Sequence, residues 1–178
     1  MTKHGTDGKQ LSLYLWGIRG TVAPRIPSVE FGNHTCCLEV RLDQRRNILV
    51  DLGSGASAAA SDAAFGGNGE FNVFMTHLHL DHLNGLATFQ PIYKRGNRVH
   101  VYGMNEEMPN AFRTLLGPPF HPVRFEELMG KISFEHIPDK GCRRLFNDSL
   151  EVRWARVPHP QGCLAYRADD GTNAVVMA

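Results

Sequence analysis

The sequence carries almost no net charge and has no long apolar run. Its 19 Lys and Arg residues nearly balance its 18 Asp and Glu residues, which leaves a formal net charge of +1. Domains that bind nucleic acid or anionic membranes usually carry a clear excess of positive charge. No segment approaches the roughly 20 apolar residues of a membrane-spanning helix. We therefore expect no membrane and no nucleic acid among its partners.

Sorting signals and cysteine motifs are missing as well. Residues 1–10 are polar and are not followed by the apolar stretch that a secretory signal peptide needs. The four cysteines show neither zinc-binding nor redox spacing, so we interpret them as thiols in or near the core. These absences favour a cytoplasmic protein with a disordered N-terminus over residues 1–10.

Length and composition are those of a soluble globular protein. The chain has 178 residues, of which 42% are hydrophobic and 21% are charged. A chain of this length can bury a sizeable core within one domain. We therefore expect a single domain over residues 11–178.

Short apolar segments alternate with a few segments of helical spacing. Apolar runs and period-two alternation predict strands at 11–16, 36–42, 47–50, 71–76, 98–102, 132–137, 150–157, 163–168 and 174–177. Apolar residues three or four apart predict helices at 55–65, 82–90 and 108–116, and a short helical turn at 124–129. The polar residues 169–172 predict a hairpin turn between the last two strands.

The richest feature of the sequence is the run THLHLDH at residues 76–82. It places three histidines and a carboxylate, His77, His79, Asp81 and His82, within six positions. Imidazole nitrogen and carboxylate oxygen together suit zinc, manganese or iron better than calcium or magnesium. The run also lies where a predicted strand ends and a predicted helix begins, which favours a metal site over a merely polar loop.

The spacing within the run divides the four side chains into two pairs. His77 and His79 are two residues apart, so in extended backbone they project to the same side and can bind one ion. Asp81 and His82 fall at the turn into the predicted helix and point elsewhere, which suits a second ion. A carboxylate at Asp81 would also be favoured by the helix dipole without any metal.

Two residues far from the run are further candidates. His159 ends the predicted strand 150–157 and lies between two prolines, which makes it the best third ligand for the first ion; the alternative is a surface histidine in a turn. Asp51 ends the strand 47–50 and could accept the free ring N–H of a ligating histidine. Alternatively, Asp51 caps the Ala-rich helix that follows Ser54.

Four segments together resemble one known family. They read LWGIRGTV at 15–22, GNHTC at 32–36, DLGSG at 51–55 and HPQGCLAYR at 159–167. With the run at 76–82 they resemble the metallo-β-lactamase superfamily, whose signature is H-x-H-x-D-H after a strand. Within it they are similar to a branch that includes phosphoribosyl cyclic phosphodiesterase-like proteins, which typically read W-G-x-R-G-S, G-G-N-T-S-C, D-x-G-T-G and H-P-G-G-x-x-x-Y-R. Phe31 and His34 depart from this pattern, which has glycine and threonine there.

The resemblance implies an α/β (α+β) fold, the αββα sandwich of two facing sheets with helices outside. In the family, a segment like 173–178 runs into an aspartate that bridges two metals, and a last histidine ligand follows later. This sequence stops at Ala178, so we expect the C-terminal part of the sandwich to be missing. His77, His79 and His159 then form a complete site for one ion, whereas the second site keeps only Asp81 and His82.

The resemblance also implies a function. We expect a metal-dependent hydrolase, most simply a phosphodiesterase that uses a metal-activated hydroxide on a small cyclic phosphate or nucleotide. Asp81 and His82 would act in catalysis, and the cofactor would be one or two zinc ions, with manganese or iron as alternatives. The matched segments supply four candidates for binding the substrate phosphate, each of which could instead serve only the structure: Arg19, Asn33, Asn84 and Arg167.

Other functions share the same motif. A thioesterase remains open, although the matched opening segments point away from it. A tRNA 3′-end nuclease would want a basic surface and a tRNA-grasping arm, and a secreted β-lactamase would want a signal peptide; the sequence has none of these. The alternative from another class is a catalytically impaired remnant that binds one metal or none and forms a homo-oligomer through its uncovered sheet face.

Overall fold

The computed structural model describes residues 11–21, 30, 32–62 and 69–178. The expected disorder of residues 1–10 and the last predicted turn of helix 55–65 lie outside these ranges. No helix in the described part of the chain is both long and apolar enough to cross a membrane.

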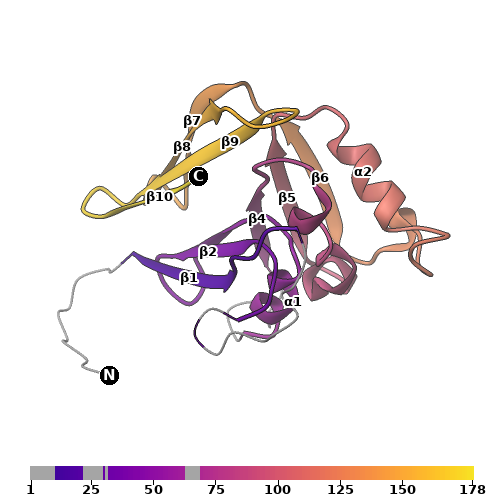
Figure 1. The fold of residues 1–178 in the computed structure, drawn as a ribbon. Coiled ribbons are helices and arrows are strands. Elements are labelled where there is room, and N and C mark those ends of the chain that lie inside the picture. The colour runs from indigo at the N-terminus through magenta and orange to yellow at the C-terminus, as the bar shows by residue number, and fades with distance from the viewer. Residues whose placement is uncertain (1–10, 22–29, 31, 63–68) are drawn as a thin grey trace.

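The described strands form two sheets that face each other (Figure 1). The six-stranded sheet has the spatial order β1 (Ser12–Gly17), β2 (Cys37–Arg41), β3 (Asn47–Val50), β4 (Glu70–Phe74), β5 (Arg98–Gly103) and β6 (Lys131–His136). The four-stranded sheet has the order β10 (Ala174–Met177), β9 (Cys163–Asp169), β8 (Leu150–Val157) and β7 (Lys140–Leu145).

The helices of the described residues pack on the outer face of the six-stranded sheet. They comprise α1 (Gly55–Ala60), α2 (Met108–Leu115) and the 3₁₀ turns η3 (Leu86–Thr88), η4 (Gln90–Tyr93) and η5 (Phe125–Glu127). A further 3₁₀ turn, η2 (Leu80–His82), contributes no buried residue to this face. One apolar core lies beneath the helices and a second lies between the sheets, where the ring of Phe74 contacts both Tyr102 and Tyr166. The predicted mixed α/β fold with two facing sheets is therefore confirmed.

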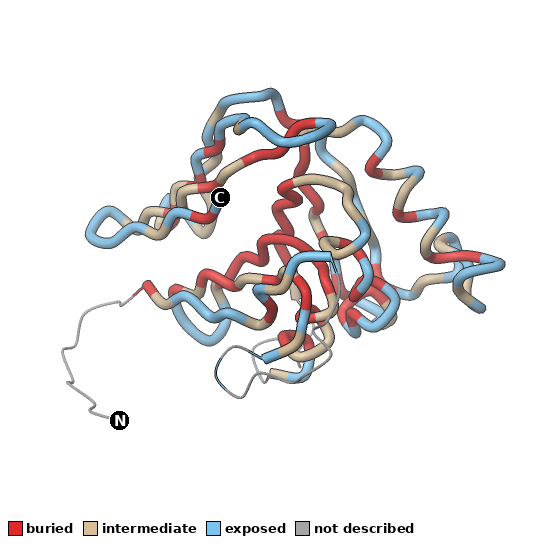
Figure 2. The backbone as a smooth tube through the Cα atoms, viewed as in Figure 1, coloured by how far each residue is buried: buried red, intermediate tan, exposed pale blue. Residues whose placement is uncertain are grey.

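The central strands explain where a site can form. β3, β4 and β5 run parallel, and β3 and nearly all of β4 are buried, as Figure 2 shows for the middle of the molecule. Strands buried on both faces read as continuous apolar runs rather than alternating ones. Because parallel strands end at the same edge of a sheet, the segments after β3 and after β4 begin side by side. Asp51 and Thr76 are therefore neighbours.

The second sheet is fastened to the same edge. The Leu164 N–H of β9 donates to the Thr76 carbonyl at 2.9 Å, and the Tyr166 hydroxyl donates to the Met75 carbonyl at 2.6 Å. Both bonds join the four-stranded sheet to the residues just past the end of β4. The turn between β8 and β9, which carries His159, is thereby held against this edge.

Most predicted elements are confirmed, with ends that differ by at most two residues. This holds for all nine predicted strands, for the hairpin turn before β10, and for the helix at 108–116, which is α2. The short helical turn predicted at 124–129 corresponds to η5.

The predicted helix at 82–90 is wrong, because this segment instead forms the 3₁₀ turns η2, η3 and the start of η4. The physical reason lies at Gly85, whose N–H donates to the carbonyl of Leu52 at 2.9 Å rather than to a carbonyl one turn earlier. This contact with the segment after β3 interrupts the helical hydrogen-bond ladder, and apolar spacing alone gives no sign of it.

Two further differences concern the other elements. β7 was not expected, because Lys140–Leu145 lacks apolar alternation; it is an edge strand, and basic residues are common on such edges. The helix predicted at 55–65 ends earlier, at Ala60, and the N–H of Ser61 already closes a tighter turn onto the Ala58 carbonyl.

We expect Gly85→Ala to destabilise the protein strongly. A Cβ at Gly85 would lie 2.0 Å from the carbonyl oxygen of Gly53, so the two loops would have to separate. Overpacking of this kind costs about 2 kcal/mol or more. Urea denaturation measures the loss, and Gly69→Ala is the matched control, because its nearest neighbour would lie 4.0 Å away. Equal stability of the two variants would contradict this prediction.

Candidate metal centre

Three histidines converge at the edge where β4 and β8 end. The Nδ1 atom of His79 lies 3.0 Å from Nε2 of His77 and 3.3 Å from Nε2 of His159. Ligands on a tetrahedral zinc ion with bonds of about 2.0–2.1 Å are about 3.3 Å apart, so these separations fit a single ion. The three ring nitrogens therefore form a ready donor set for a divalent metal.

Backbone geometry brings these rings together. His77 and His79 follow β4 in an extended segment, in which residues two apart share a side. His159 lies 80 residues beyond His79, in the turn that joins β8 to β9. The structure thus brings together the three histidines that the sequence suggested for a first ion.

The side chains of Asp81 and His82 form a second pair beside this group. Oδ2 of Asp81 lies 3.5 Å from Nε2 of His82, and the His82 ring lies 4.1 Å from that of His77, centre to centre. Although burial opposes ionisation, the Thr21 N–H and the nearby His82 hold the pKa of Asp81 below its usual value. An ionised carboxylate and a ring nitrogen therefore face the same point.

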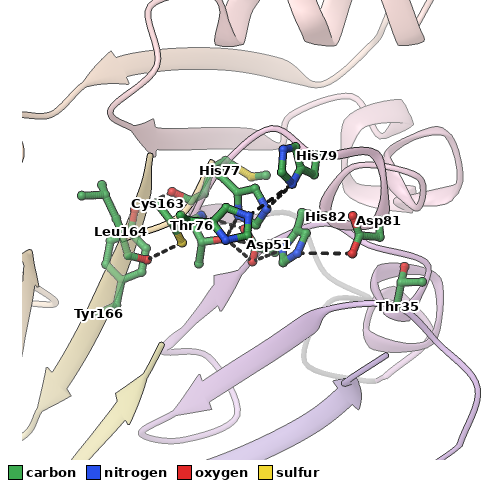
Figure 3. A network of polar contacts seen from close by, with 12 residues as sticks. Thr35, Asp51, Thr76, His77, His79, Asp81, His82, Cys163, Leu164 and Tyr166 are labelled. Atoms are coloured by element: carbon green, nitrogen blue, oxygen red, sulfur yellow. Dashed lines mark hydrogen bonds and ion pairs between the residues drawn. The ribbon is translucent and has the colours of Figure 1, made fainter. Parts of the chain in front are cut away.

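The carboxylate of Asp51 ties these residues together, as Figure 3 shows. It is fully buried and accepts hydrogen bonds from the N–H of Thr76 at 2.8 Å, from the hydroxyl of Thr76 at 2.7 Å and from Nδ1 of His82 at 2.6 Å. Burial lowers the pKa of His82, but the bond to Asp51 and the charges of Asp51 and Asp81 outweigh it and raise this pKa. Asp51 does not cap α1, whose N-cap residue is Ser54.

Thr76 sets the orientation of His77, a role that the sequence analysis missed. Its hydroxyl gives its single proton to Asp51, so it can only accept from Nδ1 of His77, 2.9 Å away. Nε2 of His77 is then the unprotonated nitrogen, and it faces His79. Burial and the neighbouring histidines lower the pKa of His77 to about 4, so this ring is neutral at neutral pH. The only sequence signal was a hydroxyl residue directly before the first histidine.

A second possible metal group consists of Cys36, Asp51 and His82, whose donor atoms lie within 4.8 Å of one another. Burial and the Asp51 carboxylate raise the pKa of the Cys36 thiol to about 12, which keeps it protonated. The carboxylate is already fully engaged by Thr76 and His82. This group therefore serves to hold the histidine in place, and the three-histidine group is the better metal donor set.

The four residues expected to bind phosphate have different surroundings. Oδ1 of Asn84 accepts the Thr35 hydroxyl at 2.8 Å, and Nε of Arg19 donates to the Gly32 carbonyl at 3.1 Å, so both already stabilise loops near Asp81. Asn33 is half-buried in the same loop region.

The structure does not bring Arg167 to the histidines, which corrects the expectation from sequence. It lies on the outer face of β9 and pairs with Asp169, because its neighbour Tyr166 points into the core between the sheets.

Comparison with known proteins bears on this arrangement. A family model described as "Metallo-beta-lactamase superfamily" matches residues 33–167. No curated protein sequence matches the chain at a significant level.

Several solved structures are similar to the chain. The metallo-beta-lactamase fold protein YhfI from Bacillus subtilis has a TM-score of 0.62 and 17% identity, over 94% of this chain and 61% of its own. A diphosphatase from the PhnP family has a TM-score of 0.59 and 17% identity, over 89% and 62%. Unliganded yeast PDE1 has a TM-score of 0.62 and 14% identity, over 92% and 63%. At these identities the likeness shows the fold alone, and the chain spans about three-fifths of each matched structure.

We expect Asp51→Asn to weaken zinc binding by roughly 10- to 100-fold, which is typical when a residue that orients a metal ligand is lost. The amide would offer N–H groups where Thr76 and His82 now donate. Titration calorimetry on metal-free protein measures the affinity. Asp148→Asn is the matched control, because Asp148 lies at a surface turn with a φ of 63° that asparagine also adopts. Unchanged affinity in Asp51→Asn would contradict the assigned role of this carboxylate.

We expect the stabilising effect of His82 in the metal-free protein to fade as the pH rises. Its pKa is raised in the folded state, so protonated His82 contributes stability that is complete below the unfolded value of about 6.5. This contribution is lost as the pH rises through the folded pKa. The difference in unfolding free energy between the wild type and His82→Gln should therefore be larger at about pH 6 than at about pH 9. Urea denaturation at both values tests this, and the opposite trend would show the sign to be wrong.

Proposed function

The chain belongs to the metallo-β-lactamase superfamily, a group of metal-dependent hydrolases, and on this premise we propose that it is a phosphodiesterase that acts on a small cyclic phosphate or nucleotide. The observation that carries the proposal is the convergence of His77, His79 and His159 with separations that suit one tetrahedral ion. Three protein ligands leave a fourth position open, which is the arrangement of catalytic rather than structural zinc sites.

The residues around the three histidines have distinct roles in this proposal. A bound divalent ion would supply Lewis acidity and lower the pKa of a coordinated water. Thr76 holds the ring of His77 in the tautomer whose Nε2 atom is free. Asp81, whose pKa is lowered, stays ionised and orients the attacking water or holds a second ion.

His82 completes this set as a proton carrier or a ligand. Its raised pKa favours the protonated ring, and the Asp51 carboxylate supports that charge from the buried side. From Nε2, 3.5 Å from Asp81, this proton can pass to a leaving oxygen. If a second ion were bound, the same nitrogen would serve as its ligand instead. Zinc is the proposed metal, with manganese and iron as alternatives for this donor set.

Similar proteins support a phosphate ester as the substrate. Two of the structural neighbours are named as a diphosphatase and as PDE1. A third is the short form of human tRNase Z, with a TM-score of 0.58 and 17% identity over 93% of this chain and 67% of its own. The formal net charge of +1 favours a small substrate over transfer RNA, whose backbone calls for a basic surface.

The test combines metal content with hydrolysis. The wild type, purified without added metal, should contain at least one transition-metal ion per chain and hydrolyse bis(4-nitrophenyl) phosphate. We expect His79→Ala to lose the metal and at least about 100-fold in activity, because a direct ligand matters more than a residue that only orients one. His100→Ala, which lies on β5 and contacts Ser133, is the matched control.

Two outcomes would contradict the proposal. Bound metal without hydrolysis of phosphodiesters would favour another reaction of the superfamily or a metal-binding remnant. Absence of metal from the wild type after zinc is supplied would overturn the metal centre itself.

A further inference from the structure

The turn that carries His159 contains a residue that is unfavourable for its backbone. The N–H of Gly162 donates to the His159 carbonyl at 2.9 Å, which closes a four-residue turn with Pro160 and Gln161 at its centre. Gln161 has a φ of 66°, and the proline ring keeps Pro160 at negative φ. Only a type II turn combines these values, and its third position strongly favours glycine or asparagine. Glutamine is therefore a costly choice here.

The neighbours of Gln161 hold it in this conformation. Gly162 is buried and has a φ of 87°, and a Cβ on it would lie 2.3 Å from the side chain of Met104. The turn is thus fixed by Pro160 on one side and by packing on the other. Strain that persists in a fixed segment next to a candidate metal ligand commonly marks a functional side chain.

The surroundings of Gln161 indicate what that side chain does. Gln161 is exposed and lines a small cavity of about 20 Å³ together with Thr76, His77 and Asn105. Thr76 is bonded to Asp51, and Oδ1 of Asn105 accepts the Glu107 N–H at 2.9 Å. Among the polar side chains on this cavity wall in the described part of the chain, Gln161 alone makes no hydrogen bond. Its carboxamide is therefore available to a ligand beside His77.

We propose that Gln161 binds the substrate, donating its amide N–H to a phosphoryl oxygen held at the three-histidine group. This inference rests on the proposed phosphodiesterase function for the identity of the substrate. The carboxamide N–H suits this position, because a hydrogen bond to an anionic oxygen is stronger than one between two neutral groups. The strained backbone is then explained by the side chain, since glycine would fit the turn but offers no donor.

The experiment measures binding of inorganic phosphate to the zinc-loaded protein by titration calorimetry. Gln161→Gly removes the donor and suits the turn, so we expect phosphate affinity to fall about tenfold while zinc content stays unchanged. The same variant should melt roughly 2–4 °C higher, because the strain is relieved. Gln161→Glu keeps the shape and adds negative charge, so it should weaken phosphate binding further. Gln44→Gly, in an exposed loop, is the matched control.

The outcomes separate this inference from the proposed function. Phosphate affinity that is unchanged in Gln161→Gly, or no phosphate binding by the zinc-loaded wild type, would overturn the role of Gln161. If the wild type binds phosphate in a Gln161-dependent manner but hydrolyses no phosphodiester, the inference stands and the proposed function fails. If hydrolysis occurs, an increased KM with little change in kcat in Gln161→Gly is expected.

Discussion

The buried carboxylate of Asp51 is the interaction on which the rest of the site depends. It lies at the end of β3, has a φ of 64°, and accepts three hydrogen bonds from the run 76–82, two from Thr76 and one from His82. A buried charge of this kind is tolerated only when it is fully hydrogen-bonded. The site and its support are therefore one unit: the bonds that satisfy Asp51 also fix Thr76, and through it the ring of His77.

Close backbone packing provides the second constraint. The loop after β3 and the loop after η2 approach so closely at Gly53 and Gly85 that neither position has room for a side chain. The same approach diverts the Gly85 N–H to Leu52. This close approach keeps Asp81 and His82 beside the ends of the parallel strands and prevents a regular helix over residues 82–90. The irregular backbone here follows from placing two ligand candidates, rather than from poor helix propensity alone.

The histidines could be identified from the sequence because the signals are local: the spacing of His77 and His79, and the prolines on both sides of His159. The sequence did not reveal Thr76 or Tyr166, because their roles exist only once the two sheets meet. Arg167 is a different case. Because Leu164 and Tyr166 point into the core, strand alternation predicts that Arg167 points outward, yet the resemblance of segment 159–167 to the family suggested a role at the site. β7 could not be predicted because the sequence of this basic edge strand shows no alternation of apolar and polar residues. Local patterns thus predicted the strands and pointed to the ligand candidates, whereas contacts across the sheets decided the rest.

The position of His159 in the turn between two strands of the second sheet has a consequence for folding. His79 and His159 are 80 residues apart and belong to different layers of the molecule. An ion held by both would act as a cross-link that closes a long loop of the unfolded chain, and its binding free energy would count toward folding. Metal binding and folding stability would then be thermodynamically linked. A chelator would remove the ion and would also weaken the contact between the two sheets.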